Sequence, residues 1–365
     1  MPKLSVTSKR HTPASLLAHA AQRRTVRKAR PSLAPAAPAP SSDELRRQAE
    51  IEHDLRLARD IQQGLLLEAV PRLPGWEISA ISLPAHELGG DLYDFLPMAH
   101  GWHGIMIGDV SGKGLPAALR MAVARTVFRY AARRDEGPGL TLAETNSGII
   151  SEIPQGMVTM LYAKLDTRHG DLWLANAGHN YPIIINAQVS ELELSGLPLG
   201  VDDEGLYEEA HACIEPGNTV VLYTDGVVEA GPPEGEIYSY TRLEHMLRAN
   251  AHLKPRALVA ALLQELRTWN GHQQADDITM VVSRRRLADL GHELRSIADD
   301  VLGTDRAGEL WRALDLEAMA ASTAGWAERM PALIGQVQSR FGRGFARELH
   351  AQLRLALEEY RLGGE

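Results

Sequence analysis

Hydrophobic and polar residues follow three different patterns along the chain, and each pattern marks a different segment. Between residues 42 and 70, apolar residues recur at helical spacing, which predicts a linker helix. Between residues 71 and 286, short β-like runs alternate with glycine-containing turns, which predicts a central domain. Residues 287–365 are rich in Ala, Leu, Glu and Arg and predict a separate helical unit.

The central domain (71–286) is expected to have an α+β fold. Because its strands come in blocks separated by consecutive helices, the order favours an α+β sandwich over a βαβ repeat. Helices are predicted at Pro116–Arg133, Leu140–Ile153 and Leu258–Trp269. Strands are predicted at Trp76–Ser82, Gly104–Val110, Met157–Lys164, Leu172–Ala175, Ile183–Asn186, Thr219–Tyr223 and Ile278–Val282.

The linker helix has two apolar stripes. Ser42 offers an N-cap, and the helix is expected to run to about Glu68, before Pro71. Two stripes suit a helix that packs on its own domain on one side and on a partner on the other. A homodimer through this helix and an ordinary packing helix both stay open. The first stripe comprises Ile51, Leu55, Ala58 and Leu65, with Gln62 interrupting it, and the second comprises Leu57 and Ile61.

The helical unit (287–365) is expected to contain about four helices. Its division is predicted from glycine and proline residues, which end helices or interrupt them. These residues are Gly303, Gly325, Pro331, Gly342 and Gly344.

Composition excludes several classes of protein. The chain has 365 residues, of which 44% are hydrophobic and 23% charged, as is usual for a globular protein. A single cysteine, Cys213, excludes an intramolecular disulfide and a cysteine-based zinc cluster, and we expect it to be at least half-buried. No apolar run is long enough to span a membrane. A net charge of −9 disfavours nucleic acid as a partner, and the expected location is the cytoplasm.

The first segment, residues 1–41, differs from the rest of the chain. Residues 1–40 hold eight Lys and Arg residues and no acidic residue, and the segment is rich in Ala and Pro. Such a composition buries too little apolar surface to order itself, so we expect a disordered basic tail. A solvated tail and contact with an anionic lipid, a nucleic acid or an acidic partner all stay open.

Four aspartate-centred turns hold the candidate chemistry. Most of these acids lie beside glycine at the start or end of an apolar run, so each carboxylate is expected at a strand tip. Converging carboxylates repel one another unless cations lie between them, and oxygen ligands suit Mg²⁺ or Mn²⁺. Taken singly, each motif is also an ordinary turn. The turns are Gly89-Gly90-Asp91-Leu92-Tyr93-Asp94, Gly108-Asp109-Val110-Ser111-Gly112-Lys113-Gly114, Tyr223-Thr224-Asp225-Gly226 and Asp276-Asp277-Ile278-Thr279.

The order and content of these turns resemble a known family over residues 45–285. Further matching segments are Ala58-Arg59-Asp60-Ile61-Gln62, Asn176-Ala177-Gly178-His179 and Gly196-Leu197-Pro198-Leu199-Gly200, with Glu229 after the third turn. The chain resembles the metal-dependent protein serine/threonine phosphatases of the PPM superfamily, in the bacterial SpoIIE/RsbU-type branch. The resemblance implies two stacked antiparallel β-sheets flanked by helices, with metals at one edge.

The resemblance also implies a site for two Mn²⁺ or Mg²⁺ ions. Asp109 would bridge the two ions. Asp91 and the carbonyl of Val110 would complete the coordination of one ion, and Asp225 and Asp276 would complete that of the other. A water activated by the two metals would then hydrolyse a phosphate ester in line, without a phosphoenzyme.

Other residues of the matched motifs are expected to support the metal ligands, or have a role that the sequence does not decide. Asp94 and Asp277 are expected to support the ligands or to be structural. Ser111 stands where eukaryotic relatives have a histidine that acts as a general acid. Serine is a poor acid near neutral pH, so water or Lys113 would protonate the leaving group. Lys113 equally fits the role of a solvated lysine in a loop. His179 is expected to be structural or to line the cleft.

The resemblance implies a substrate but leaves alternatives. The substrate would be phosphoserine or phosphothreonine on a STAS-domain anti-anti-sigma factor or a similar partner-switching protein, in the regulation of transcription or stress signalling. A catalytically weak scaffold that binds signalling partners, and hydrolysis of a small phosphorylated metabolite, both stay open.

The end of the helical unit has a second, partial resemblance. Leu349–Tyr360 is similar to a helix of the anti-sigma-factor kinases of the GHKL class, but no ATP-binding asparagine follows it. ATP binding is therefore not expected. A truncated kinase-like module and a plain helical interaction domain stay equal alternatives.

Overall fold

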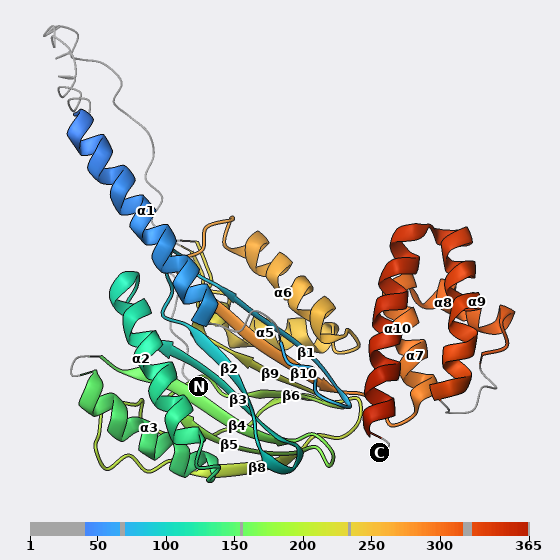
Figure 1. The fold of residues 1–365 in the computed structure, drawn as a ribbon, viewed down its shortest axis with the longest axis horizontal. Coiled ribbons are helices and arrows are strands. Elements are labelled where there is room, and N and C mark those ends of the chain that lie inside the picture. Colours follow the sequence, from blue (N-terminus) through green and yellow to red (C-terminus); the bar gives the residue numbers. More distant parts are fainter. Residues whose placement is uncertain (1–40, 66–69, 154–155, 233–234, 317–322, 364–365) are drawn as a thin grey trace, which may run out of the picture. The chain divides into compact units, whose positions relative to one another are not determined.

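The computed structural model describes residues 41–65, 70–153, 156–232, 235–316 and 323–363. The central domain consists of two stacked five-stranded antiparallel sheets with helices on both outer faces (Figure 1). This confirms the predicted α+β class. The first sheet has the order β1 (Trp76–Leu83), β10 (Ile278–Arg285), β9 (Thr219–Tyr223), β6 (Ile183–Ile185) and β7 (Val189–Glu191). The second has the order β2 (Leu92–Pro97), β3 (Trp102–Val110), β4 (Val158–Asp166), β5 (Asp171–Ala177) and β8 (Glu209–Cys213).

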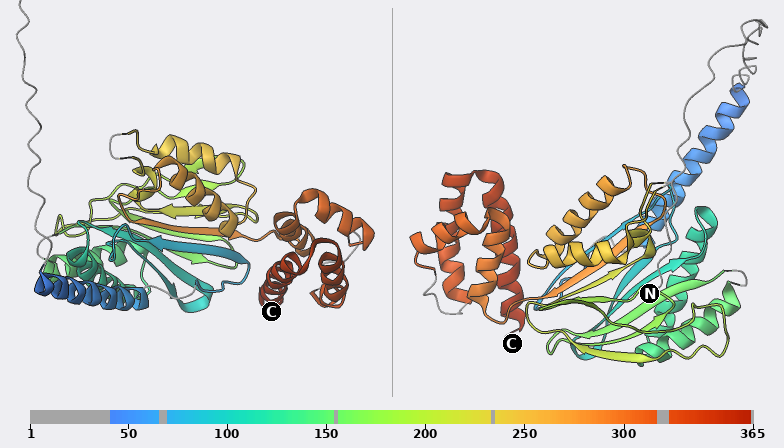
Figure 2. Two further views of the ribbon diagram at one scale, coloured as in Figure 1. Left: turned by 90° about the horizontal axis from the view of Figure 1, so that it is seen from above. Right: turned by 180° about the vertical axis from the view of Figure 1, so that it is seen from behind.

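Alternation along the strands explains the layered core. In β3, Ile105 and Ile107 belong to the apolar cluster between the sheets, whereas Met106 belongs to the cluster under the helices. Successive side chains of a strand point to opposite faces, so a strand covered on both sides is apolar throughout. Helices α2 (Leu115–Ala132) and α3 (Pro138–Glu152) cover the second sheet, and α5 (Ser239–Ala249) and α6 (Pro255–Trp269) cover the first (Figure 2).

Several elements were not predicted. Strands β2, β7 and β8 and helices α4 (Asp225–Val228) and α5 were missed. In β2 the pattern is broken by Asp94, which is fully buried because Arg125 and Arg129 of α2 neutralise it; Arg129 Nη2 donates to Asp94 Oδ1 at 2.9 Å. The expected burial of Cys213 is wrong, because it lies exposed at the end of strand β8, at the edge of the second sheet.

Helix α1 (Ser42–Leu65) forms the linker, but its cap and its buried face differ from the prediction. Its N-terminus is capped by Ser41 rather than Ser42, since Glu44 N donates to Ser41 Oγ and Ser41 N donates to the Glu44 carboxylate. Gln62, expected to interrupt the apolar face, is the buried residue of the helix. The predicted end at Glu68 lies outside the described residues.

In the described residues of the helical unit, four helices surround an apolar core of their own. They are α7 (Leu290–Leu302), α8 (Thr304–Ala313), α9 (Thr323–Phe341) and α10 (Arg343–Gly363). Gly303 and Gly342 separate helices as expected, and their φ angles of 85° and 96° favour glycine. Gly325 and Pro331, expected to divide helices, lie inside α9, where Met330 and Leu333 are buried. No described helix is long and apolar enough to cross a membrane.

Candidate active site

The acids of the four predicted turns meet at one end of the two sheets. Asp91 directly precedes β2, and Asp109 lies near the end of β3, where the register places Leu92 opposite Gly108. Asp225 begins α4 two residues after β9, and Asp276 lies just before β10, which pairs with β9. The candidate site therefore takes carboxylates from both sheets.

Thr224 connects the two sheets at this point. Its Oγ1 donates to Oδ2 of Asp91 at 2.8 Å and accepts a hydrogen bond from Thr279 N at 3.0 Å. Asp91 is only 3% exposed, so this hydroxyl fixes the orientation of a buried carboxylate.

Asp277 holds the turn on which Asp91 lies. Its Oδ1 accepts a hydrogen bond from Ala85 N and its Oδ2 one from Gly90 N, each at 2.7 Å. Asp277 is therefore tied to the backbone before β2. Asp94, by contrast, is held by the arginines of α2.

Two glycines allow the backbone to approach closely at the site. A Cβ at Gly90 would lie 2.7 Å from the carbonyl oxygen of Val110 and 3.4 Å from Asp109 Oδ1. A Cβ at Gly226 would lie 1.9 Å from the carbonyl oxygen of Asp277. Larger residues would displace the strand ends, so these glycines are required by the packing of the turns.

Crowding of negative charge shifts the pKa values of these acids. Burial, followed by the charges of Asp225 and Asp276, raises the pKa of Asp109 to about 7. Burial and the charge of Asp109 raise the pKa of Asp91 well above its usual range. Burial and the charge of Asp276 raise that of Asp225. Hard oxygen donors that oppose one another's ionisation fit divalent cations such as Mg²⁺ and Mn²⁺.

Lys113 forms an ion pair with this acidic group. Its Nζ lies 3.0 Å from Oδ2 of Asp276 and donates to the carbonyl of Ala275 at 2.7 Å. Its side chain is 50% exposed. Ser111 is engaged otherwise, since its Oγ accepts a hydrogen bond from Met157 N at 3.1 Å and pins the loop.

His179 is buried behind the site. Its Nδ1 lies 2.9 Å from Oγ1 of Thr159, which pairs with Asp109 in the β3–β4 register. Burial lowers the pKa of His179 to about 4, so the ring is neutral near pH 7. Its Nε2 has no hydrogen-bond partner among the described residues. A buried neutral ring agrees with the structural or cleft-lining role that was expected.

Sequence reasoning missed the role of Gln62. Its Nε2 donates to the carbonyl of Gly89 at 2.7 Å, and Gly89 N donates to its Oε1 at 3.2 Å. Helix α1 is thus hydrogen-bonded to the turn that precedes Asp91. A polar residue on the packing face of an amphipathic helix was the available signal.

A second group of potential metal ligands lies at the far end of β4, away from Thr159. The ligand atoms of Asp166, His169 and Asp171 lie within 4.8 Å of one another. Hydrogen bonds of the turn account for this arrangement: Asp166 accepts from His169 Nδ1 at 2.8 Å, and Asp171 pairs with His211 at 2.8 Å. This group contains none of the predicted ligands.

Comparison with known proteins identifies the family. The model of the family "Stage II sporulation protein E (SpoIIE)" matches residues 100–286. Phosphoserine phosphatase RsbU of Bacillus subtilis is 29% identical over 244 residues, which cover 66% of this chain and 72% of RsbU. Protein IcfG of Synechocystis is 29% identical over 262 residues, covering 64% of this chain and 41% of IcfG, so the chain spans less than half of that relative.

Solved structures agree with this result. The SiaA-PP2C domain of Pseudomonas aeruginosa has a TM-score of 0.59 and 26% identity, with 66% of this chain and 98% of that domain covered. The RsbU and RsbW domains of Rv1364c from Mycobacterium tuberculosis share the fold, with a TM-score of 0.55 and 23% identity over 70% of this chain and 75% of theirs. The chain thus belongs to the SpoIIE family, the SpoIIE/RsbU branch of the PPM metal-dependent protein serine/threonine phosphatases.

Proposed function

We propose that this phosphatase removes phosphate from phosphoserine or phosphothreonine on a partner-switching regulator, specifically a STAS-domain anti-anti-sigma factor. The observation on which the proposal rests is the meeting of Asp91, Asp109, Asp225 and Asp276 at one end of the two sheets, with the pKa of Asp109 raised to about 7. A relative named phosphoserine phosphatase RsbU supports the substrate class.

The proposed site holds two Mn²⁺ or Mg²⁺ ions. Asp109 would bridge them, with Asp91 and the Val110 carbonyl on one ion and Asp225 and Asp276 on the other. Such a pair of ions supplies an acidified water and neutralises the oxygens of a phosphoryl group.

Neighbouring residues of the chain position these metal ligands and would donate the proton to the leaving group. Thr224 and Asp277 orient the Asp91 carboxylate and its turn, and Gly90 lets this turn lie against the Val110 carbonyl and Asp109. Because Ser111 is engaged with Met157, Lys113 or solvent would protonate the leaving group.

Phosphate release from a phosphorylated STAS protein tests this function. We expect release with Mn²⁺ or Mg²⁺, none after chelation, and much slower turnover of p-nitrophenyl phosphate. No release in the presence of either metal would favour the scaffold alternative. Equal turnover of small esters would favour a metabolite phosphatase.

The raised pKa of Asp109 predicts that metal binding depends on pH. The folded, metal-free protein holds a proton on Asp109 between its ordinary pKa of 3.8 and about 7, so the metal-free protein loses stability as pH rises through this range. Ions must displace that proton, so we expect the rise in melting temperature caused by Mn²⁺ to increase between about pH 5.5 and pH 7.5. Thermal melts with Mn²⁺ or EDTA measure this, and a rise independent of pH would contradict it.

We further propose that α1 transmits a signal by changing how it packs on the central domain. Leu55 is half-buried and Gln62 is buried, whereas Ile61 is 60% exposed. Changing Leu55 and Ile61 together to serine should alter activity about tenfold, which is a typical strength of coupling between two sites of a protein. The metal affinity of the site should not change. Turnover and Mn²⁺ titration measure this, with exposed Arg59→Gln as the control. Unchanged activity and regulation would contradict the switch.

We also propose that the chain forms a homodimer through the exposed side of α1. Leu57 and Ile61 of the second stripe are 54% and 60% exposed, and Ile51, which was expected in the first stripe, is 60% exposed as well. Exposed apolar side chains of this kind suit a second helix as their partner. Light scattering of the full chain and of an Ile51→Ser, Leu57→Ser variant would show whether these side chains hold a dimer together.

A further inference from the structure

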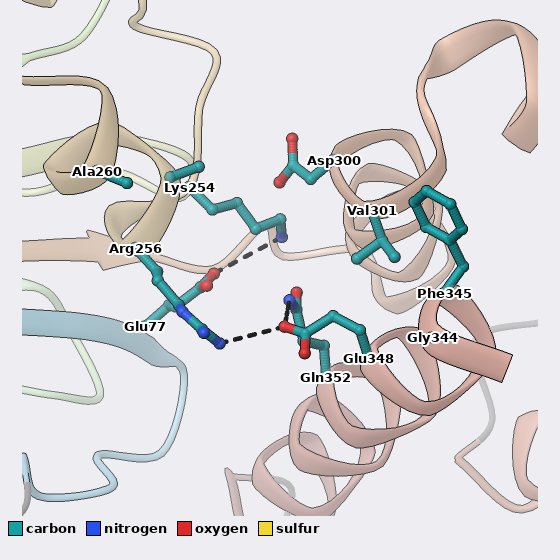
Figure 3. A pocket seen from close by; sticks show the side chains of 11 residues that line it. Glu77, Lys254, Arg256, Ala260, Asp300, Val301, Gly344, Phe345, Glu348 and Gln352 are labelled. Carbon is teal, nitrogen blue, oxygen red and sulfur yellow. Dashed lines mark hydrogen bonds and ion pairs between the residues drawn. The ribbon is translucent and has the colours of Figure 1, made fainter. Parts of the chain in front are cut away.

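A cavity with a volume of about 540 Å³ lies between the central domain and the helical unit (Figure 3). Lys254, Arg256 and Ala260 line it on the side of the central domain. Asp300 and Phe345 line it on the side of the helical unit. The cavity shares no residue with the candidate active site.

One part of the cavity wall is apolar. Phe345 is 40% exposed, so its ring is available to a ligand. Val301 of α7 is half-buried, and Ala260 of α6 lies on the opposite wall. These side chains would cover the hydrocarbon part of a small molecule.

The charged groups of the cavity are paired, with one exception. Lys254 Nζ lies 2.6 Å from Glu293 Oε1 and 3.7 Å from Glu77 Oε2. Arg256 Nη1 lies 3.2 Å from Glu348 Oε1. Asp300 has no hydrogen bond or close ion pair with any residue that the structure describes, and no dashed line reaches it in Figure 3. Burial raises its pKa to about 6, and the charge of Lys254, which is held by Glu293, only partly opposes this. The cavity therefore presents one carboxylate that a bound group could neutralise.

We propose that this cavity binds a small organic cation. Its ammonium or guanidinium group would pair with Asp300, and its apolar body would lie against Phe345 and Val301. An anion is disfavoured, because both cations of the lining, Lys254 and Arg256, are already paired with carboxylates. A ligand here contacts both sides of the cavity, so its binding stabilises the attachment of the helical unit to the central domain. The proposal is independent of the phosphatase reaction.

Calorimetric titration with phenethylamine and cyclohexylmethylamine tests the proposal. The full chain is titrated near pH 7.5 with Mg²⁺ present, so that amines do not compete for the acids of the active site. We expect both amines to bind, and 2-phenylethanol, which has the same ring but no charge, to bind at least about tenfold more weakly. Failure of both amines to bind at millimolar concentration would overturn the proposal.

Matched variants locate the binding. Asp300→Asn should weaken amine binding about tenfold, and Phe345→Ala should weaken both the amines and the alcohol. Asp305→Asn changes an exposed acid of α8 outside the cavity and should leave binding unchanged. Because Phe345 and Asp300 lie at the surface of the unit, both variants should fold, which circular dichroism checks. Amine binding that is equal in Asp300→Asn and in the unchanged protein would overturn the assignment.

Discussion

Replacing Asp225 by asparagine is expected to reduce metal-dependent phosphate release more than about 100-fold, beyond the loss typical of residues that only support ligands. Asparagine keeps the size of the side chain but removes the negative charge that would hold an ion. Asp225 lies at the start of α4, and its pKa is raised by burial and by the charge of Asp276. Fixed-time assays of phosphate release over a range of Mn²⁺ concentrations measure the effect.

Stability separates loss of the metal site from loss of the fold. Because the neutral side chain no longer repels Asp276, metal-free Asp225→Asn should melt at the same temperature as the unchanged protein or higher, and Mn²⁺ should raise its melting temperature less. Asp203→Asn, an exposed acid outside the cluster, is the matched control and should retain full activity. Turnover of Asp225→Asn within a few-fold of the unchanged protein would contradict the proposed ligand role.

The parts of the fold that were predicted are those that depend on local pattern. Strands β1, β3, β4, β9 and β10 are apolar runs bounded by turns, and they were found within a few residues of their observed ends. Strand β2 was missed because Asp94 breaks its apolar pattern, and its neutralising arginines lie 31 and 35 residues later in the chain. The spacing of hydrophobic residues along the chain does not reveal ion pairs between residues so far apart in the sequence.

The candidate site divides in the same way. The sequence placed the acids at strand tips, and the family resemblance implied that they share one metal site. In the structure, antiparallel register brings the start of β2 beside the end of β3, and with them Asp91 beside Asp109. The partners that orient them could not be predicted, because they come from distant segments: Gln62 bonds to a residue 27 positions away and Thr224 to one 133 positions away. Side-chain hydrogen bonds of this kind depend on the tertiary fold alone.

Replacing Glu293 by alanine is expected to lower the free energy of unfolding by about 3–5 kcal/mol, as when one partner of a buried ion pair is removed. Glu293 is fully buried on α7, and its carboxylate accepts hydrogen bonds from Lys254 Nζ at 2.6 Å and Arg286 Nη1 at 3.1 Å. Arg284 lies 3.3 Å away. Alanine would remove the carboxylate that these three buried cations share, and only Arg286 would keep a close partner, Glu359 at 2.7 Å. Urea unfolding followed by circular dichroism measures the loss.

The pKa of Glu293 predicts the pH range in which this stabilisation disappears. Burial alone would raise it, but Lys254, Arg284 and Arg286 hold it at about 2, below its ordinary value of 4.5. The folded state therefore favours the ionised form, and the stabilisation is present above about pH 4.5 and is lost as pH falls towards 2. Glu293→Gln keeps the volume and should lose less than alanine, whereas Glu309→Ala, an exposed acid of α8, should lose almost nothing. If Glu293→Ala unfolded at the same urea concentration as Glu309→Ala, the cluster would not hold the helical unit to the end of β10.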